Sequence, residues 1–103
     1  MKTITKEIAT AFIAGKAKSL NNTTTNGREV FLFNNLIARK MEDGTSRVSL
    51  AGWNTPTTRE RVNGILRLAG SSKGISTKKG QAKLYDRATG LTVDISSDDW
   101  ITV

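Results

Sequence analysis

Apolar residues near the start of the chain recur at the spacing of one helix face. Four of them stand at positions i, i+4, i+7 and i+8: Ile4, Ile8, Ala11 and Phe12. Thr3 can cap the start of such a helix, and Gly15 can adopt the left-handed conformation that ends it. The pattern therefore predicts an amphipathic helix over residues 4–14.

The pattern then changes to polar and later to short apolar runs. Residues 16–28 are rich in Asn and Thr, which compete for local backbone hydrogen bonds, so we expect a loop there. Three runs typical of strands follow: Glu29–Phe33, Leu36–Lys40 and Arg47–Leu50. With two-residue turns at Asn34-Asn35 and Asp43-Gly44, these runs form an antiparallel meander.

That register assigns two faces to the predicted meander. The face expected in the core carries Val30, Leu32, Ile37, Met41, Val48 and Leu50, with Arg39 as its one charge. The other face carries Phe31, Phe33, Leu36 and Ala38 beside Lys40 and Arg47. Its mixture of aromatic and cationic side chains makes it the face whose role the pattern leaves open.

A second helix is predicted over residues 57–69. Two starts remain open: Pro56 suits a first helical position, and Thr57 to Glu60 matches a capping box. The buried stripe consists of Val62, Ile65, Leu66 and Ala69, and Gly70 ends the helix. Gly64 in its interior indicates either a close approach by another element or a tolerated defect.

After this helix, residues 70–81 are rich in Gly, Ser and Lys and are expected to form a mobile loop. Residues 82–86 and 91–95 predict a hairpin, and residues 100–103 a final edge strand. The fold class is thus one α+β domain over residues 1–103. It comprises an N-terminal helix, a three-stranded antiparallel meander, a second helix and a C-terminal β-hairpin.

Composition excludes several kinds of chemistry. The chain has 103 residues, no Cys and no His, which removes disulfides, thiolate or imidazole metal sites and a cysteine nucleophile. The acidic groups Glu42-Asp43 and Asp94, Asp98 and Asp99 offer oxygens that suit a hard divalent ion. Asp43 before Gly44, and Asp98-Asp99 before Trp100, suit turns instead, so we expect no metal and no cofactor. No catalytic motif, membrane span or signal peptide is present, and we expect a non-enzymatic, soluble protein.

Charge supplies the main functional signal. Sixteen Lys and Arg against nine Asp and Glu give a net charge of +7, and residues 59–83 hold seven bases and one acid. Such a field attracts polyanions, although a solvated basic face would have the same composition. The residues expected to contact nucleic acid are Arg59, Asn63, Arg67, Lys73, Lys78 and Lys79. Arg59, Asn63 and Arg67 share one helix edge, where base readout is a further alternative.

Aromatic residues offer a second kind of contact. Phe31 and Phe33, among cations on one sheet face, suit either stacking on unpaired bases or packing beneath a helix. Trp53, if exposed, suits an anchor for a protein partner.

Two segments, Leu32–Arg39 and Ser49–Asn63, resemble a group of small proteins from tailed bacteriophages, with similarity over roughly residues 30–69. Gly52 to Arg61 is the most distinctive part. That group has no assigned functional residues to carry over. The resemblance implies a viral origin, expression in the cytoplasm of an infected bacterium, and a non-enzymatic role in host takeover, defence evasion or genome handling.

Two main hypotheses follow. The first is an accessory phage protein that binds DNA or RNA, or a nucleoprotein complex, through non-specific backbone contacts. The alternative is an inhibitor that docks on an acidic patch of a host protein, either a defence effector or a transcription or replication enzyme. A virion component is a third possibility.

Overall fold

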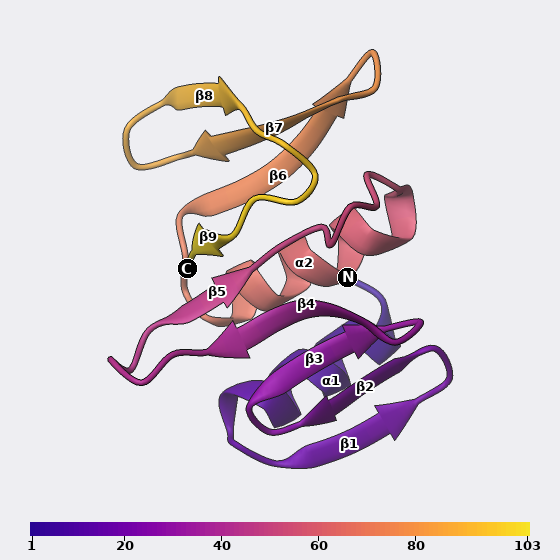
Figure 1. Cartoon of the computed structure of the whole chain (residues 1–103). Coiled ribbons are helices and arrows are strands. Elements are labelled where there is room, and N and C mark those ends of the chain that lie inside the picture. Colours follow the sequence, from indigo (N-terminus) through magenta and orange to yellow (C-terminus); the bar gives the residue numbers. More distant parts are fainter.

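The computed structural model describes residues 1–103 and contains two helices and two antiparallel sheets, so the α+β class is confirmed (Figure 1). The helices are α1 (Thr3–Ile13) and α2 (Pro56–Leu68). The strands are β1 (Ala17–Leu20), β2 (Thr23–Asn26), β3 (Glu29–Leu32), β4 (Asn35–Lys40), β5 (Ser46–Val48), β6 (Lys73–Lys78), β7 (Gln81–Asp86), β8 (Leu91–Asp94) and β9 (Ile101–Thr102). Neither helix is long and apolar enough to cross a bilayer.

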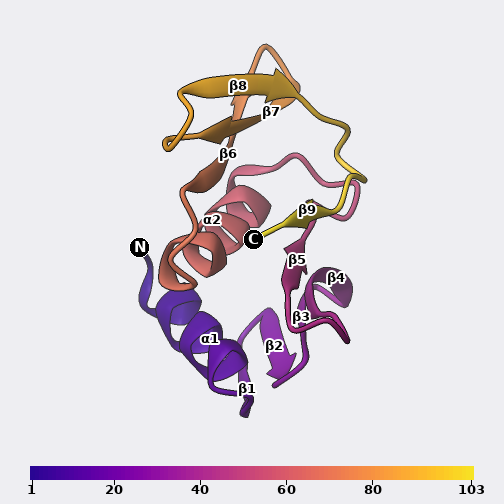
Figure 2. The same cartoon turned by 90° about the vertical axis from the view of Figure 1, so that its left-hand side faces the viewer.

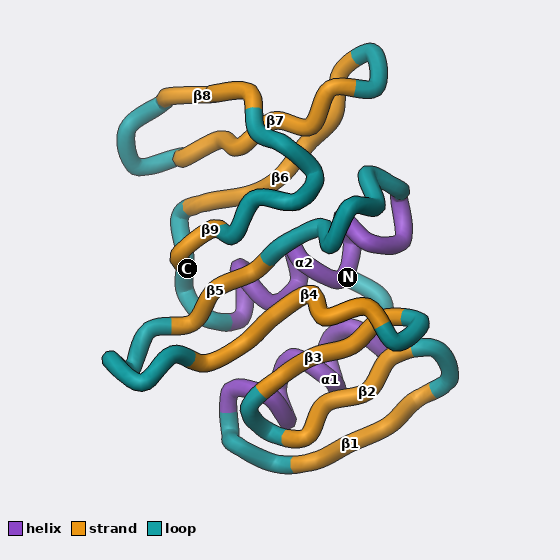
Figure 3. The backbone as a smooth tube through the Cα atoms, in the orientation of Figure 1, coloured by secondary structure: helices purple, strands orange, loops and turns teal.

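The larger sheet has six strands in the order β1-β2-β3-β4-β5-β9, and the smaller has the order β6-β7-β8. Both helices lie on one side of the larger sheet, and the smaller sheet lies beyond α2 (Figure 2). The chain leaves β8 and returns to the larger sheet, where β9 pairs with β5 as the predicted edge strand (Figure 3). The predicted arrangement is matched only in part: the three-stranded meander is the β3–β5 portion of a six-stranded sheet, and the C-terminal hairpin, β7 and β8, has β6 as a third strand.

Helix α1 supplies its predicted face to the core. Ile8 and Phe12 are each 1% exposed, and they pack in a cluster with side chains of the larger sheet and of α2. Gly15, at φ +73°, follows the helix as expected. The predicted cap at Thr3 is wrong: Lys2 is the N-cap residue, and no side chain caps this end.

Of the two possible starts for α2, the structure has the one with Pro56 in the first turn. Thr55 is the cap, and its Oγ1 accepts a hydrogen bond from the Thr58 N–H at 3.3 Å. The capping box is therefore wrong, because Glu60 contacts α1 instead, accepting from the Thr5 hydroxyl and the Lys2 N–H.

Gly64 is a close-approach position. A Cβ there would collide with the Cγ2 of Thr5, so α1 and α2 approach at this point because Gly64 has no side chain. Arg61, only 5% exposed, reinforces the contact by donating to the hydroxyls of Thr5 and Thr23, each at 3.0 Å. Ala69, which was predicted in the buried stripe of this helix, is exposed.

The predicted loop over residues 16–28 is wrong, because the structure has the hairpin β1–β2 there. Thr23 and Thr25 are buried and alternate with exposed Thr24 and Asn26, which is strand periodicity with threonine in the inward positions. Their hydroxyls are satisfied: Thr25 donates to the Glu29 carbonyl at 2.7 Å. Threonine is β-branched and suits a strand, but it is not apolar enough to mark a buried face by sequence pattern.

The turn between β3 and β4 lies one residue earlier than predicted. Phe33 and Asn34 have φ of +48° and +66°, so they form the turn, and Leu32 pairs with Asn35. A register shift at Val30/Phe31 then pairs Val30 with Ala38. Both Ile37 and Ala38 are therefore buried, although Ala38 was predicted on the opposite face.

The loop between β4 and β5 is longer than the predicted two-residue turn. The Met41 N–H donates to the Thr45 carbonyl at 2.7 Å, and Arg39 pairs with Arg47 across the strands. These two arginines therefore share a face rather than lying on opposite faces, and Met41 is half-buried rather than in the core. Arg39 lies over the ring of Trp100, with its Cζ 4.5 Å from the ring centroid.

The predicted mobile loop over residues 70–81 is also wrong, since Lys73–Lys78 forms β6, paired along its length with β7. Only Ile75 in this strand is a large apolar residue, and it is 3% exposed. A single buried apolar residue is too weak a signal to predict a strand in a segment that otherwise consists mainly of Gly, Ser and Lys.

Candidate nucleic-acid interface

Helix α2 and strand β6 run side by side in opposite directions, and Asn63 joins them at the middle. Its Oδ1 accepts from the Ile75 N–H at 2.7 Å, and its Nδ2 donates to the Ile75 carbonyl at 2.8 Å. The carboxamide thus pairs with the open edge of β6 as a neighbouring strand would. Asn63 was predicted to contact nucleic acid. In the structure, both the oxygen and the nitrogen of its carboxamide bond to the Ile75 backbone, so its side chain connects α2 to β6.

At one end of this contact, three cations line a pocket of 400 Å³. Arg67 comes from α2, Lys73 from the start of β6 and Arg87 from the β7–β8 turn, with Asn63 and Tyr85 completing the lining. The Lys73 Nζ donates to the Thr102 carbonyl at 2.7 Å. Because cations predominate in its lining, the pocket is electrostatically suited to an anion.

One carboxylate, Asp86, lies near this pocket. Hydrogen bonds from the Ser72 hydroxyl and the Ala88 N–H, assisted by the charges of Lys73 and Arg87, hold the pKa of Asp86 below its usual range. Its Oδ1 accepts both of those hydrogen bonds, at 2.6 and 2.9 Å. Asp86 stays ionised at neutral pH, but it makes no ion pair with either cation.

At the opposite end of the α2–β6 contact, Asn54 links Arg59 to the part of the β6–β7 hairpin that carries Lys78 and Lys79. Arg59 donates from Nη1 to the Asn54 Oδ1 at 2.6 Å. The Asn54 Nδ2 donates to the Thr77 Oγ1 at 2.9 Å, near the end of β6, and to the Gly80 carbonyl at 3.2 Å, in the β6–β7 turn. Lys78 and Lys79 lie between these two residues in the sequence. The structure therefore divides the predicted basic residues between the two ends of α2.

Most cations of this region have no acidic partner. Ion pairs link Arg61 to Glu60 and Lys83 to Asp94, and Lys18 pairs with Glu7 far away on α1. The bases between residues 59 and 87 that form no ion pair are Arg59, Arg67, Lys73, Lys78, Lys79 and Arg87. We call these six residues the basic strip. Along β6, the backbone positions of Lys73 and Lys78 are about 16 Å apart.

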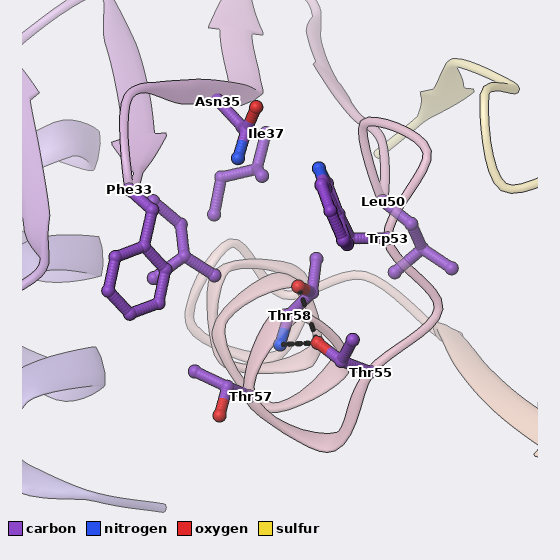
Figure 4. A pocket seen from close by; sticks show the side chains of 9 residues that line it. Phe33, Asn35, Ile37, Leu50, Trp53, Thr55, Thr57 and Thr58 are labelled. Atoms are coloured by element: carbon purple, nitrogen blue, oxygen red, sulfur yellow. Dashed lines mark hydrogen bonds between the residues drawn. The ribbon is translucent and has the colours of Figure 1, made fainter.

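The three aromatic candidates differ in exposure. Phe31 is half-buried and alternates with the buried Val30 and Leu32, so it points away from the helices rather than packing beneath one. Phe33 is 66% exposed and Trp53 is 56% exposed. Both border one groove near the N-terminal end of α2, where they stand on opposite sides (Figure 4).

Three residues of this region were not among the predicted site residues. Arg87 and Tyr85 line the basic pocket, and Asn54 links Arg59 to the β6–β7 turn. Arg87 lies near Lys73 because Lys73 pairs with Asp86 across β6 and β7. Only a correct prediction of β6 and its register with β7 would have revealed this neighbourhood.

The acidic residues near the C-terminus have local roles. Asp99 accepts from the Ser96 N–H at 2.8 Å, a contact within a turn. No group of three or more acidic side chains in the structure is arranged to hold a metal ion.

The comparisons with known proteins agree with the phage resemblance. No curated protein and no solved structure matches the chain. The family model described as Kyanoviridae Gp96 protein matches residues 1–102, nearly the whole sequence. The chain therefore belongs to this family of bacteriophage proteins.

Proposed function

We propose that this phage protein binds nucleic acid, alone or in a nucleoprotein complex, through phosphate contacts to the basic strip and without catalysing a reaction. One observation supports the proposal above the others: six cations lie along α2, β6 and the adjoining turns without forming an ion pair. Cations without acidic partners attract a polyanion from a distance and bind it with release of counterions. Its site of action would be the cytoplasm of the infected bacterium.

Within the strip, the pocket end offers the better-formed contact. Arg67, Lys73 and Arg87 line one hollow, whereas Lys78, at the end of β6, and Lys79, in the turn after it, are exposed. Phosphate oxygens accept hydrogen bonds from guanidinium and ammonium groups, and these contacts carry no base information. Binding is thus expected to be indifferent to sequence.

The test is a titration of labelled single- and double-stranded DNA at several salt concentrations. Neutralising about five phosphates gives a slope of log affinity against log salt of roughly −4 to −5. A triple variant carrying Arg67→Gln, Lys73→Gln and Arg87→Gln is expected to reduce the magnitude of that slope by about 2 to 3.

The matched control removes three exposed cations elsewhere, by Lys6→Gln, Lys16→Gln and Arg28→Gln. Both triple variants have the same net charge, so a difference between them identifies the surface rather than the overall charge. Equal losses of affinity in the two variants, or no binding by the wild type at low salt, would overturn the proposal.

The exposure of Trp53 favours a second candidate function, docking on a host protein with an acidic patch. An exposed tryptophan beside cations is typical of a protein-contact anchor. A pull-down from bacterial lysate separates the two functions: a host protein retained after nuclease treatment supports docking, and loss of every partner supports nucleic-acid binding.

A further inference from the structure

The groove between Phe33 and Trp53 has a chemistry distinct from that of the basic strip. Its volume is 470 Å³, and Leu32, Ile37 and Leu50, all nearly fully buried, form its apolar base. The remaining lining consists of Asn35, Thr55, Thr57 and Thr58. No ionisable side chain lines the groove, so a charged group placed there would have no counter-charge.

Both aromatic side chains are held at the groove by unusual backbone. Phe33 itself has φ +48°, a conformation that bulky L-residues disfavour. Trp53 directly follows Ala51 and Gly52, at φ +53° and +85°, and its N–H closes this turn on the Leu50 carbonyl at 2.9 Å. Since neither ring is needed to fill the core, the turns present two aromatic faces to solvent.

Such a groove matches an unpaired nucleobase. A base has flat faces that stack on aromatic rings and a polar edge that bonds to amide and hydroxyl groups, and stacking tolerates any sequence. Figure 4 shows the two rings on opposite sides, with the Asn35 amide near the space between them. The Thr58 hydroxyl also lies toward this space and is hydrogen-bonded to the Thr55 hydroxyl, whereas the Thr57 hydroxyl points away. Bases within a duplex are already stacked and paired, which restricts this site to single strands.

The neighbouring charges suit the phosphates on either side of such a base. Asn54, the residue after Trp53, contacts Arg59 and also Thr77 and Gly80, the residues on either side of Lys78 and Lys79. One end of the basic strip therefore adjoins the groove. An uncharged aromatic groove beside unpaired cations is complementary to a strand that alternates bases with phosphates.

We infer that the groove between Phe33 and Trp53 takes an unpaired base of single-stranded nucleic acid, whose flanking phosphates contact Arg59, Lys78 and Lys79. This inference rests on the proposed function and adds to it a preference for single strands.

The experiment measures anisotropy of three labelled probes: an oligothymidylate of about 12 nucleotides, an abasic strand of equal phosphate number, and a duplex. The wild type is expected to bind oligothymidylate roughly tenfold more tightly than the abasic strand. Phe33→Ala and Trp53→Ala should each remove most of that preference without weakening abasic binding. Trp53→Phe, which keeps an aromatic face, should retain it.

Leu91→Ala serves as the matched control, because Leu91 is 65% exposed and lies on β8, outside the groove. Equal affinity for the intact and abasic strands would overturn the inference while leaving the proposed function standing. Absence of binding to all three probes would instead overturn the proposed function. Equal weakening of both single strands by Trp53→Ala, or a host protein captured through Trp53 without any preference for bases, would also refute a base site.

Discussion

The two sheets are held in place by different means. The larger sheet and the two helices contain nearly all of the buried apolar cluster, whereas the smaller sheet contributes to it only Ile75 and Ala82. Polar contacts also attach the smaller sheet, among them Asn63 of α2 to Ile75 and Lys73 to the Thr102 carbonyl of β9. The larger sheet and the helices are therefore held together mainly by buried apolar side chains. The smaller sheet, which carries most of the basic strip, is oriented by hydrogen bonds as well.

The largest difference between the two parts is expected when one apolar side chain is truncated in each: one in the helices and larger sheet, and one in the smaller sheet. Phe12→Ala is expected to lower the free energy of unfolding by about 3–5 kcal/mol, because it leaves a cavity in the first of these parts. Leu91→Ala, on exposed β8, should change it by less than about 0.5 kcal/mol. Urea denaturation measures both. A large loss for Leu91→Ala would mean that β8 is covered in solution.

A second substitution tests how tightly the two helices meet. Gly64→Ala raises helix propensity by about 1 kcal/mol, yet we expect a net loss of about 1–3 kcal/mol, since the new methyl collides with Thr5. Adding Thr5→Ser removes the colliding methyl and keeps the hydroxyl that contacts Glu60 and Arg61. The double variant should recover most of the loss in the same assay, and failure to recover would contradict the close approach.

Acid pH should lower the free energy of unfolding by protonating Glu60, which joins α2 to α1. Partial burial raises the pKa of Glu60, but hydrogen bonds from the Thr5 hydroxyl, the Lys2 N–H and Arg61, with the Arg61 charge, outweigh that effect and lower it. A pKa lower in the folded than in the unfolded chain stabilises the fold above the unfolded value, near 4.5, and this contribution is lost as pH falls through the folded value. Glu60→Gln should therefore flatten the decline in melting temperature below pH 4.5, whereas the exposed Glu42→Gln should not.

The smallest expected effect is local to the smaller sheet. Asn63→Ala removes two hydrogen bonds from the β6 edge, and the Ile75 amide should exchange with deuterium roughly tenfold faster, for a local change of about 1 kcal/mol. Asn63→Asp keeps an acceptor for that amide but sets a carboxylate oxygen against the Ile75 carbonyl, so it should restore only part of the protection. Unchanged exchange in Asn63→Ala would show that β6 is held by other contacts.

Sequence periodicity was sufficient where burial is apolar. The spacing of Ile8 and Phe12 predicted α1, and that of Val62, Ile65 and Leu66 predicted α2. Periodicity did not predict the strands whose buried or bonded positions are polar. Threonines occupy the inward positions of β2, and the Asn63 side chain hydrogen-bonds to the edge of β6. Such contacts depend on partners distant in sequence, so no local window reveals them.

The candidate site shows the same limit. Local charge density predicted Arg59, Arg67, Lys73, Lys78 and Lys79 as contact residues, because cations concentrate in one stretch of the chain. Their division between two ends of α2, and the addition of Arg87, follow from the register of β6 against β7. The shared groove of Phe33 and Trp53 depends on two turns twenty residues apart and on backbone angles that the sequence pattern did not indicate.

The left-handed backbone at Phe33 bears on how the family can evolve. Asparagine or glycine accepts that conformation more readily, so either residue at position 33 would relieve strain on the order of 1 kcal/mol. Variants recovered purely for heat tolerance should therefore lose the ring at this turn. Its persistence across viruses from many hosts would be a sign that natural selection acts there on recognition rather than on folding.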